Sequence, residues 1–411
     1  MPNSNVTSPD LAKRLHELVL SGQDLEKNRI TAKSSPFWAG LAKTGTRLWL
    51  DTGDMAAAEK SWTSEFSGLT TNNTLLNKEV QTGSYDTFIP EVSKLVSSLE
   101  PSHEVLEIAF ALNARHGLRL VGRFGSWVSV ELHTDLANDL ERSVAYGIRY
   151  HAICPERFIV KIPMTPSGLI AARTLGERGI PVNLTLGFSA RHNYLTTAVA
   201  KPRYVNVFLG RLGAYVSDHK LGDPHLVGEK ALWASQKMVR QLGAGKTLQI
   251  AASLREAVQL EDLAGCDVIT MPTPVAEGGV KTLKGTWSDH AGVTQAVSVP
   301  KPEALRLSTL WDVSDKERTL VDGLTKKPAM SGMELTERIR AAGCGDLFPK
   351  LSTEDQQHIS ADGKIPKHER WAARIASGEL AIDTLLNLAA LASFTTDQAA
   401  LDARIRKNMG R

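Results

Sequence analysis

Cysteine is scarce in this chain of 411 residues, which contains only three, Cys154, Cys266 and Cys344, far apart in the sequence. They form neither a CxxC pair nor a zinc-ligand spacing, so the sequence indicates no disulfide framework and no structural zinc site. No stretch approaches the ~18 apolar residues of a membrane-spanning helix. The polar N-terminus lacks the apolar segment of a signal peptide. Together these absences predict a cytoplasmic protein with reduced thiols and no membrane association.

An excess of one charge is also missing, since 48 Lys and Arg residues are nearly balanced by 45 Asp and Glu residues. The basic residues form no stripe, so nucleic acid is not an expected partner. Gly122 and Gly125 form no dinucleotide-binding fingerprint, because no helix is expected directly after them. With 42% hydrophobic and 23% charged residues, the composition fits a globular protein.

Short apolar runs alternate with helical segments along the first two thirds of the chain. Eight strands alternating with helices predict an α/β protein, a parallel (β/α)8 TIM barrel, whose chemistry is expected at the C-terminal ends of the strands. The strands are expected at Arg47–Asp51, Gly68–Asn72, Trp127–Glu131, Phe158–Pro163, Ile180–Leu186, Tyr204–Leu209, Thr247–Ala252 and Asp267–Met271. Helical segments include Leu75–His116, broken at Gly83 and Pro101, and also Gly168–Arg178 and Arg255–Leu263.

Two extensions flank the predicted barrel. An amphipathic helix is expected at Asp10–Ser21, and a long helix with one apolar face at Leu380–Met409. The segment before the last helix is rich in Pro, Gly and charge, and its length suggests that it covers the active-site rim or mediates oligomerisation. The expected division is an N-terminal helical extension over 1–45, the barrel core over 46–275, an inserted loop and helical segment of unknown role over 276–379, and a C-terminal helix packing on the barrel over 380–411.

Lys161 stands in the middle of the fourth predicted strand, whose other residues are apolar. Burying an ammonium group is costly unless it is paired or loses its proton. A lysine that loses its proton becomes a nucleophilic amine, which can form a Schiff base with a carbonyl. A lysine near a strand end that extends to water is the alternative. The apolar surroundings also suggest that Lys161→Ala would preserve the fold.

Polar residues at or near the C-terminal ends of other strands favour a buried, reactive Lys161 over a lysine that extends to water. Side chains alternate along a strand, and the polar ones lie opposite the aliphatic stripe that would pack on the helices. Inward polar residues at one rim can converge on one pocket. These residues are Asp51, Glu131, Asn183, Thr185 and Asn206, with Phe208 on the face of Asn206.

The residue types suit reactions of a phosphorylated sugar. Carboxylates can transfer protons and stabilise an iminium, and neutral donors and acceptors can hold hydroxyl groups or a water. Arginine and serine at the rim can bind phosphate. Each residue also has a structural alternative, such as a helix cap for Asp51 or Ser253 and a solvated surface charge for each arginine. The carboxylates are Asp51 and Glu131, the neutral groups Asn72, Asn183 and Thr185, and the phosphate-binding candidates Arg211, Ser253 and Arg255.

Seven segments in this order resemble the transaldolases, Schiff-base aldolases of the (β/α)8 type. The most specific are the Lys-Ile-Pro-x-Thr and Asn-Leu-Thr-Leu segments, and the C-terminal helix is also similar to that of the family. The segments are Leu48–Asp54 (LWLDTGD), Gly68–Asn72 (GLTTN), Ser129–Glu131 (SVE), Val160–Gly168 (VKIPMTPSG), Val182–Ser189 (VNLTLGFS), Val207–Arg211 (VFLGR) and Ala252–Arg255 (ASLR).

The resemblance implies a reaction of the pentose phosphate pathway. A dihydroxyacetone unit would pass from sedoheptulose 7-phosphate to glyceraldehyde 3-phosphate, giving erythrose 4-phosphate and fructose 6-phosphate, without a metal or organic cofactor. The expected partners are phosphorylated ketose and aldose sugars, and the expected assembly is a monomer or a homodimer.

The resemblance also implies a role for each matching residue. Lys161 would form the Schiff base, Asp51 would take the proton from the C4 hydroxyl, and Glu131 would assist dehydration through a water held by Thr185. The substrate-binding residues would be Asn72 and Asn183 for the dihydroxyacetone unit, Thr70 in support, Asn206 and Phe208 in the pocket, and Arg211, Ser253 and Arg255 for the phosphate.

Two residues depart from the family pattern. Asn206 stands where many members have Ser, and Asn73 stands where they have Pro. An aldolase that releases dihydroxyacetone is one alternative, although such relatives use a Tyr acid where this chain has Phe208. A related enzyme with another acceptor and a non-catalytic sugar-phosphate-binding barrel are the others.

Overall fold

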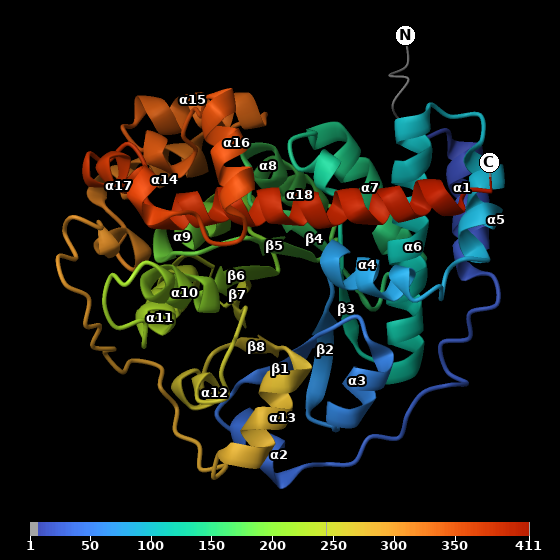
Figure 1. Cartoon of the computed structure of the whole chain (residues 1–411), viewed down its shortest axis with the longest axis horizontal. Coiled ribbons are helices and arrows are strands. Elements are labelled where there is room, and N and C mark those ends of the chain that lie inside the picture. The colour runs from blue at the N-terminus through green and yellow to red at the C-terminus, as the bar shows by residue number, and fades with distance from the viewer. Residues whose placement is uncertain (1–6, 244, 411) are drawn as a thin grey trace.

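Eight parallel strands close into a barrel in the computed structural model, which describes residues 7–243 and 245–410 (Figure 1). The predicted (β/α)8 fold is therefore confirmed. β1, β3 and β4 have the predicted bounds, and the other strands differ by one to two residues at their ends. The strands are β1 (Arg47–Asp51), β2 (Phe66–Thr70), β3 (Trp127–Glu131), β4 (Phe158–Pro163), β5 (Val182–Thr185), β6 (Tyr204–Phe208), β7 (Leu248–Ala252) and β8 (Val268–Met271).

Pairing between neighbouring strands brings the polar side chains to one end of the barrel. Asp51 of β1 pairs with Thr70 of β2. Glu131 of β3 pairs with Lys161 of β4, which pairs with Asn183 of β5. Because the strands are parallel, all these residues lie near the C-terminal mouth, where barrel proteins carry their sites.

Helices surround the barrel. Their bounds are α3 (Met55–Ser61), α4 (Asn73–Gln81), α5 (Phe88–Val96), α6 (Pro101–Phe124), α7 (Leu140–Ile153), α8 (Pro166–Gly176), α9 (Ala190–Ala200), α10 (Leu209–Asp218), α11 (Val227–Gly243), α12 (Gln259–Asp262) and α13 (Thr273–Thr282), with a 3-10 turn η1 (Thr134–Leu136) after β3.

The helices between β2 and β3 match the breaks expected at Gly83 and Pro101, but the last of them extends further than predicted. Pro101 opens α6 because the first helical position needs no N–H donor. The helix ends only at Gly125, which has a φ of 64° in the left-handed region that glycine adopts without strain.

Before the barrel lie α1 (Pro9–Leu20) and α2 (Pro36–Ala42). α1 confirms the predicted helix to within one residue and packs on α5 and α6. α2 places Trp38 against Phe66 of β2, with ring centroids 5.3 Å apart. The first six residues of the predicted N-terminal extension lie outside the described residues.

After β8, helix α13 extends across the boundary predicted at residue 275. A long connection then leads to a group of helices on one side of the barrel (Figure 1). Within this group α14 packs on α9, and α15 packs on α8. The elements are η2 (Leu307–Leu310), α14 (Asp315–Lys326), α15 (Gly332–Ala341), η3 (Gly345–Leu347), α16 (Thr353–Asp362) and α17 (His368–Ala376).

A buried ionic cluster joins this group to the barrel. Arg191 of α9 donates through Nε to Asp383 at 2.8 Å, and through Nη1 to Glu317 at 3.1 Å and to Asp346 at 2.8 Å. Glu317 belongs to α14 and Asp346 to η3. One guanidinium thus satisfies three carboxylates, which fixes the added helices on the barrel.

The last helix, α18 (Ile382–Asn408), crosses the C-terminal mouth (Figure 1). Asn387 donates to the carbonyls of Leu186 at 2.8 Å and Met164 at 3.3 Å, which follow β5 and β4. The prediction of one apolar face is wrong for the first turns, where residues 382–387 are all buried between the barrel and the added helices. Within the described residues, no helix is long and apolar enough to cross a membrane.

Candidate active site

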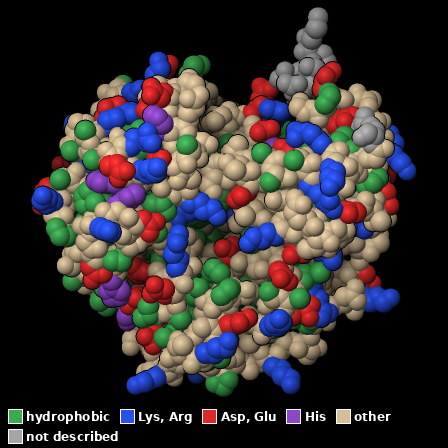
Figure 2. Space-filling view, viewed as in Figure 1, with side chains coloured by type: hydrophobic (Ala, Val, Ile, Leu, Met, Phe, Trp, Pro, Cys, Tyr) green, Lys and Arg blue, Asp and Glu red, His purple; other side chains and the backbone are tan. Residues whose placement is uncertain are grey.

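A cavity lies at the C-terminal mouth of the barrel, next to α18. Eight of the residues predicted for the site line it, namely Asp51, Thr70, Asn72, Lys161, Asn206, Phe208, Arg211 and Ser253. The face of the molecule that carries α18 is hollowed near its centre, and Lys and Arg side chains gather at the edge of the hollow (Figure 2). Closure of the barrel thus brings together strand residues and residues of the loops and helices that follow the strands.

Lys161 is buried, and its amine has defined partners. Nζ lies 3.3 Å from Oε1 of Glu131, and the two side chains are 5% and 3% exposed. Nζ also donates to the carbonyl of Thr71 at 3.2 Å. The lysine therefore does not extend to water, which removes the alternative considered from the sequence.

Glu131 does not line the cavity but lies behind the amine. Its Oε2 accepts a hydrogen bond from the backbone N–H of Asn73 at 3.1 Å. Burial raises the pKa of the Glu131 carboxyl, and the charge of Lys161 and the Asn73 N–H oppose this rise. Asn73 can make this bond because, unlike a proline, it has an N–H group.

Asp51 is the second carboxylate of the site. Thr70 donates its hydroxyl to Oδ1 of Asp51 at 2.8 Å, and the Thr70 oxygen lies 2.7 Å from that of Thr270 on β8. Burial raises the pKa of the Asp51 carboxyl, against the charge of Lys161 and the Thr70 hydrogen bond. Raised carboxyl pKa values favour proton transfer near neutral pH.

The neutral residues form a network behind the cavity. Asn206 lines the cavity and donates through Nδ2 to Oδ1 of Asn183 at 2.5 Å. Asn183 in turn donates to the Ser129 hydroxyl at 3.0 Å and does not line the cavity. Thr185 is fully buried, and its hydroxyl has no hydrogen-bond partner among the described residues. An unsatisfied buried hydroxyl is a place where a water can bind.

The side chain of Asn72 caps a helix and also lines the cavity. It accepts a hydrogen bond from the N–H of Leu75 at 2.9 Å and so caps α4. The cap explains why β2 ends at Thr70, two residues earlier than predicted, because Asn72 belongs to the start of the helix.

One end of the cavity is cationic. Arg211 is 6% exposed, and its Nη1 has no hydrogen-bond partner among the described residues. Burial and then the charge of Arg255 lower the pKa of Arg211 to about 10. Ser253 lines the cavity with a φ of 66°, whereas Arg255 is exposed and lies outside the cavity wall. The Arg211 guanidinium forms no salt bridge with a carboxylate among the described residues, although the charge of Asp397 acts on it, and this makes it a candidate anion site.

Three residues from the C-terminal third of the chain were missed by the sequence analysis. Phe394 and Asp397 of α18 line the cavity, as does Lys364 from the loop between α16 and α17. The Phe394 ring lies 5.6 Å from Nζ of Lys161. Asp397 accepts a hydrogen bond from Thr74, also in the cavity wall, at 2.5 Å. No strand pattern marks these residues, because tertiary packing alone brings them to the mouth.

Metal and thiol chemistry find no support in the described ranges. No group of three or more His, Cys, Asp or Glu residues there could hold a metal ion. The three cysteines are buried as free thiols, and none lines the cavity.

The fold and the cavity define a class, a (β/α)8 barrel with a buried lysine and two carboxylates at its C-terminal mouth. Residues 48–300 match the sequence model of the Transaldolase/Fructose-6-phosphate aldolase family. The chain therefore belongs to this family and is an enzyme of the transaldolase and aldolase type.

Individual relatives carry the name transaldolase. The protein of Synechocystis sp. is 30% identical over 356 residues, which cover 78% of this chain and 86% of the relative. That of Xanthomonas oryzae pv. oryzae (strain PXO99A) is 31% identical over 242 residues, 55% of this chain and 73% of the relative. That of Xanthomonas euvesicatoria pv. vesicatoria is 33% identical over 185 residues, 42% of this chain, and the match spans only 56% of that relative.

Proposed function

We propose that the chain is a transaldolase that moves a dihydroxyacetone unit from sedoheptulose 7-phosphate to glyceraldehyde 3-phosphate. The products are erythrose 4-phosphate and fructose 6-phosphate. The observation that carries the proposal is the buried Lys161 amine, 3.3 Å from Glu131, in a cavity that Arg211 also lines. An amine and an anion site in one cavity suit a phosphorylated ketose.

The first half of the reaction forms the Schiff base. The Lys161 ammonium gives a proton to a neighbouring base, and the free amine adds to the C2 carbonyl of the ketose. The hydroxyl of the carbinolamine then takes up a proton and leaves as water, which gives the iminium. Glu131 assists this loss through a water held by Thr185, whose buried hydroxyl lacks another partner among the described residues. Neither group lines the cavity, so both can act without blocking the substrate.

The second half breaks and forms a C–C bond. Asp51 takes the proton of the C4 hydroxyl, the C3–C4 bond breaks, and the iminium accepts the electron pair as an enamine. The shortened aldose leaves, and the enamine adds to the aldehyde carbon of the acceptor while Asp51 returns the proton. Hydrolysis of the new iminium frees the product and restores Lys161. The raised pKa of Asp51 supports this role in proton transfer.

Release of free dihydroxyacetone is the second candidate function, since the family also contains aldolases. Among the described residues, the cavity wall contains Phe208 and no tyrosine. The resemblance implies that such aldolases use a Tyr acid in this pocket. Without that acid, protonation of the enamine is disfavoured, and transfer to an aldehyde is favoured over release. A direct assay for dihydroxyacetone without an acceptor separates the two.

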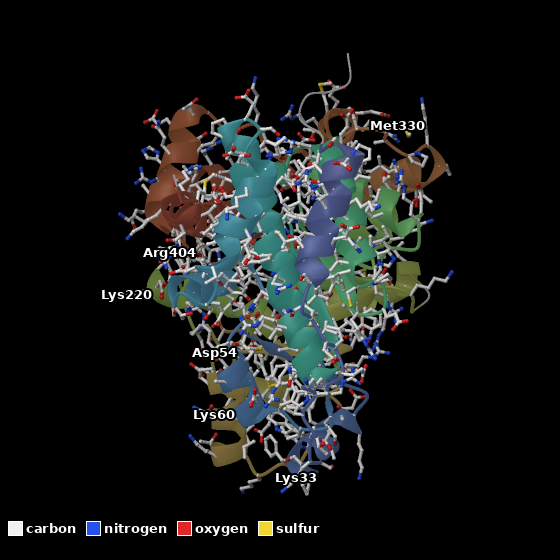
Figure 3. The ribbon with its side chains drawn as sticks, turned by 90° about the vertical axis from the view of Figure 1, so that its right-hand side faces the viewer. Lys33, Asp54, Lys60, Lys220, Met330 and Arg404 are labelled. Carbon is white, nitrogen blue, oxygen red and sulfur yellow. The ribbon has the colours of Figure 1, made fainter. Side chains whose placement is uncertain are left out.

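The test is intact-mass measurement after borohydride reduction with fructose 6-phosphate or sedoheptulose 7-phosphate. The native chain and a Lys60→Ala control should gain the mass of a reduced dihydroxyacetone unit, and Lys161→Ala should not. Lys60 is an exposed lysine at the end of the molecule formed by α2 and α3 (Figure 3). No adduct on the native chain with either ketose would refute the proposed donor. An adduct that persists in Lys161→Ala would refute the Schiff-base lysine.

A further inference from the structure

The helices after α13 are not needed to close the barrel, yet one of the loops between them returns to its mouth. Lys364 lies in this loop, between α16 and α17, and lines the same cavity as Lys161 and Arg211. The side chain of Lys364 is exposed, so it meets the cavity from the solvent side. The added segment therefore contributes a cation to the site.

The loop is held on the barrel by the helix that also carries Arg211. His219, just after α10, donates through Nε2 to the carbonyl of Pro366 at 2.7 Å. Tyr215 of α10 is hydrogen-bonded to Nδ1 of His368 at 2.7 Å. Because α10 carries Arg211 and also contacts this loop, the backbone of the loop is held near Arg211.

The loop is also closed internally. The backbone N–H of Lys367 donates to Oδ2 of Asp362 at 3.1 Å, across the turn that contains Lys364. The Asp362 side chain is also 3.5 Å from Arg370 of α17. A turn with these fixed ends limits the positions from which the Lys364 ammonium can reach the cavity.

Neither cation has a salt-bridge partner among the described residues, although the charge of Asp397 acts on Arg211. Among the residues that the structure describes, Lys364 and Arg211 form no ion pair within 4.0 Å. Asp397, also in the cavity wall, accepts a hydrogen bond from the Thr74 hydroxyl and acts on Arg211 only through its charge. Two cations that line one cavity and form no salt bridge there can attract a dianion.

We propose that Lys364 is a substrate-binding residue that recognises the phosphate group of the sugar together with Arg211. This inference rests on the proposed function for the identity of the substrate. Lysine suits the task because its ammonium is a point charge on a flexible stem, which can follow a phosphate that enters from solvent. The added segment then supplies a part of substrate recognition that the barrel core lacks.

The primary test is binding of inorganic phosphate to the full chain by calorimetry, which requires no catalysis. Lys364→Met should weaken binding about tenfold, since one charge-assisted contact contributes about that factor. Lys364→Arg should restore most of it. The matched control is Lys367→Met, which removes an exposed lysine of the same loop that does not line the cavity. Equal affinity in Lys364→Met and the native chain would overturn the inference, as would an equal loss in Lys367→Met.

A second test uses the trapping reaction. In Lys364→Met, half-maximal adduct formation should need about tenfold more fructose 6-phosphate, while the concentration of unphosphorylated fructose needed should change less than twofold. Equal shifts for both sugars would contradict phosphate recognition by Lys364. Failure of the native chain to form any adduct would refute the proposed function, and the calorimetric result would still decide whether Lys364 binds phosphate.

Discussion

Replacing Lys161 by methionine should make the stability of the protein depend on pH. Methionine keeps most of the volume of the lysine side chain and removes its charge. Glu131, which is 3.3 Å from the amine and 3% exposed, would lose its ion-pair partner. Loss of one member of a buried pair costs about 3–5 kcal/mol while the other stays charged. The apolar surroundings alone had suggested that a substitution here would leave the fold intact, and the pair changes that expectation.

The sign of the effect follows from the pKa of Glu131. Burial already raises it, and loss of the amine raises it further. At a pH below the ordinary pKa of a carboxyl group, Glu131 is protonated in both the folded and the unfolded chain. No unpaired charge is then buried, and the substitution carries no electrostatic cost. As the pH rises from that ordinary value toward the raised pKa, only the unfolded chain loses its proton. The native chain loses stability in the same way up to its own raised Glu131 pKa. Above that value the free energy of unfolding of the variant continues to fall, by up to ~1.4 kcal/mol per pH unit relative to the native chain.

The assay is urea unfolding of both proteins at pH 5 and pH 9, with equal slopes against denaturant as the condition for comparison. Lys161→Met should be close to the native chain at pH 5 and about 3–5 kcal/mol less stable at pH 9. Adding Glu131→Gln should remove most of the pH dependence, and the remainder would come from Asp51, which the amine also stabilises. If the free energy of unfolding of Lys161→Met were lower than that of the native chain by the same amount at both pH values, Glu131 and Lys161 would not be coupled as argued.

Two further predictions concern the neighbours of this pair and the phosphate end. Asn73→Pro removes the N–H that Glu131 accepts at 3.1 Å but is compatible with the first position of α4, whereas Asn73→Ala keeps that N–H. The acid limb of the pH profile of kcat/KM should therefore lie about one unit higher in the proline variant than in the alanine variant, and coincident profiles would exclude a role for the N–H. Arg211→Ala should raise KM for fructose 6-phosphate about a hundredfold. Arg255→Ala, at an exposed position, should raise KM less than about tenfold, and high salt should remove this effect. Equal effects of the two arginines would contradict the cavity described.

The bounds of a strand could be predicted closely where its apolar run ends at a residue that also ends the strand. β4 ends at Pro163, where the chain turns into the next loop, and its bounds were correct. β5 was predicted too long, because Leu186 adopts a φ of 70° and leaves the extended conformation. The helix expected at Arg255–Leu263 was also too long, because the side chain of Gln259 accepts the N–H groups of Arg255 and Glu256 and so replaces the first helical turn.

Some residues of the site could be predicted from local strand geometry, and others depend on tertiary packing. The alternation of strand side chains was enough to place Asp51 and Lys161 on the inner face, since that rule depends only on local backbone geometry. It could not distinguish residues in the cavity wall from those one layer behind it. Glu131 and Asn183 lie behind the wall, where hydrogen bonds with the Asn73 N–H and the Ser129 hydroxyl hold their side chains. The position of a residue along its strand does not reveal such bonds.

The rim residues required knowledge of packing between distant segments. Phe394 reaches Lys161 only because α18 crosses the mouth, and α18 is fixed there by the burial of Asp383 against Arg191. The same guanidinium holds α14 and η3, so one cluster positions both the helix over the cavity and the segment that carries Lys364. The barrel strands thus supply Lys161 and Asp51 to the cavity wall, while the segments beyond the barrel supply Lys364, Phe394 and Asp397.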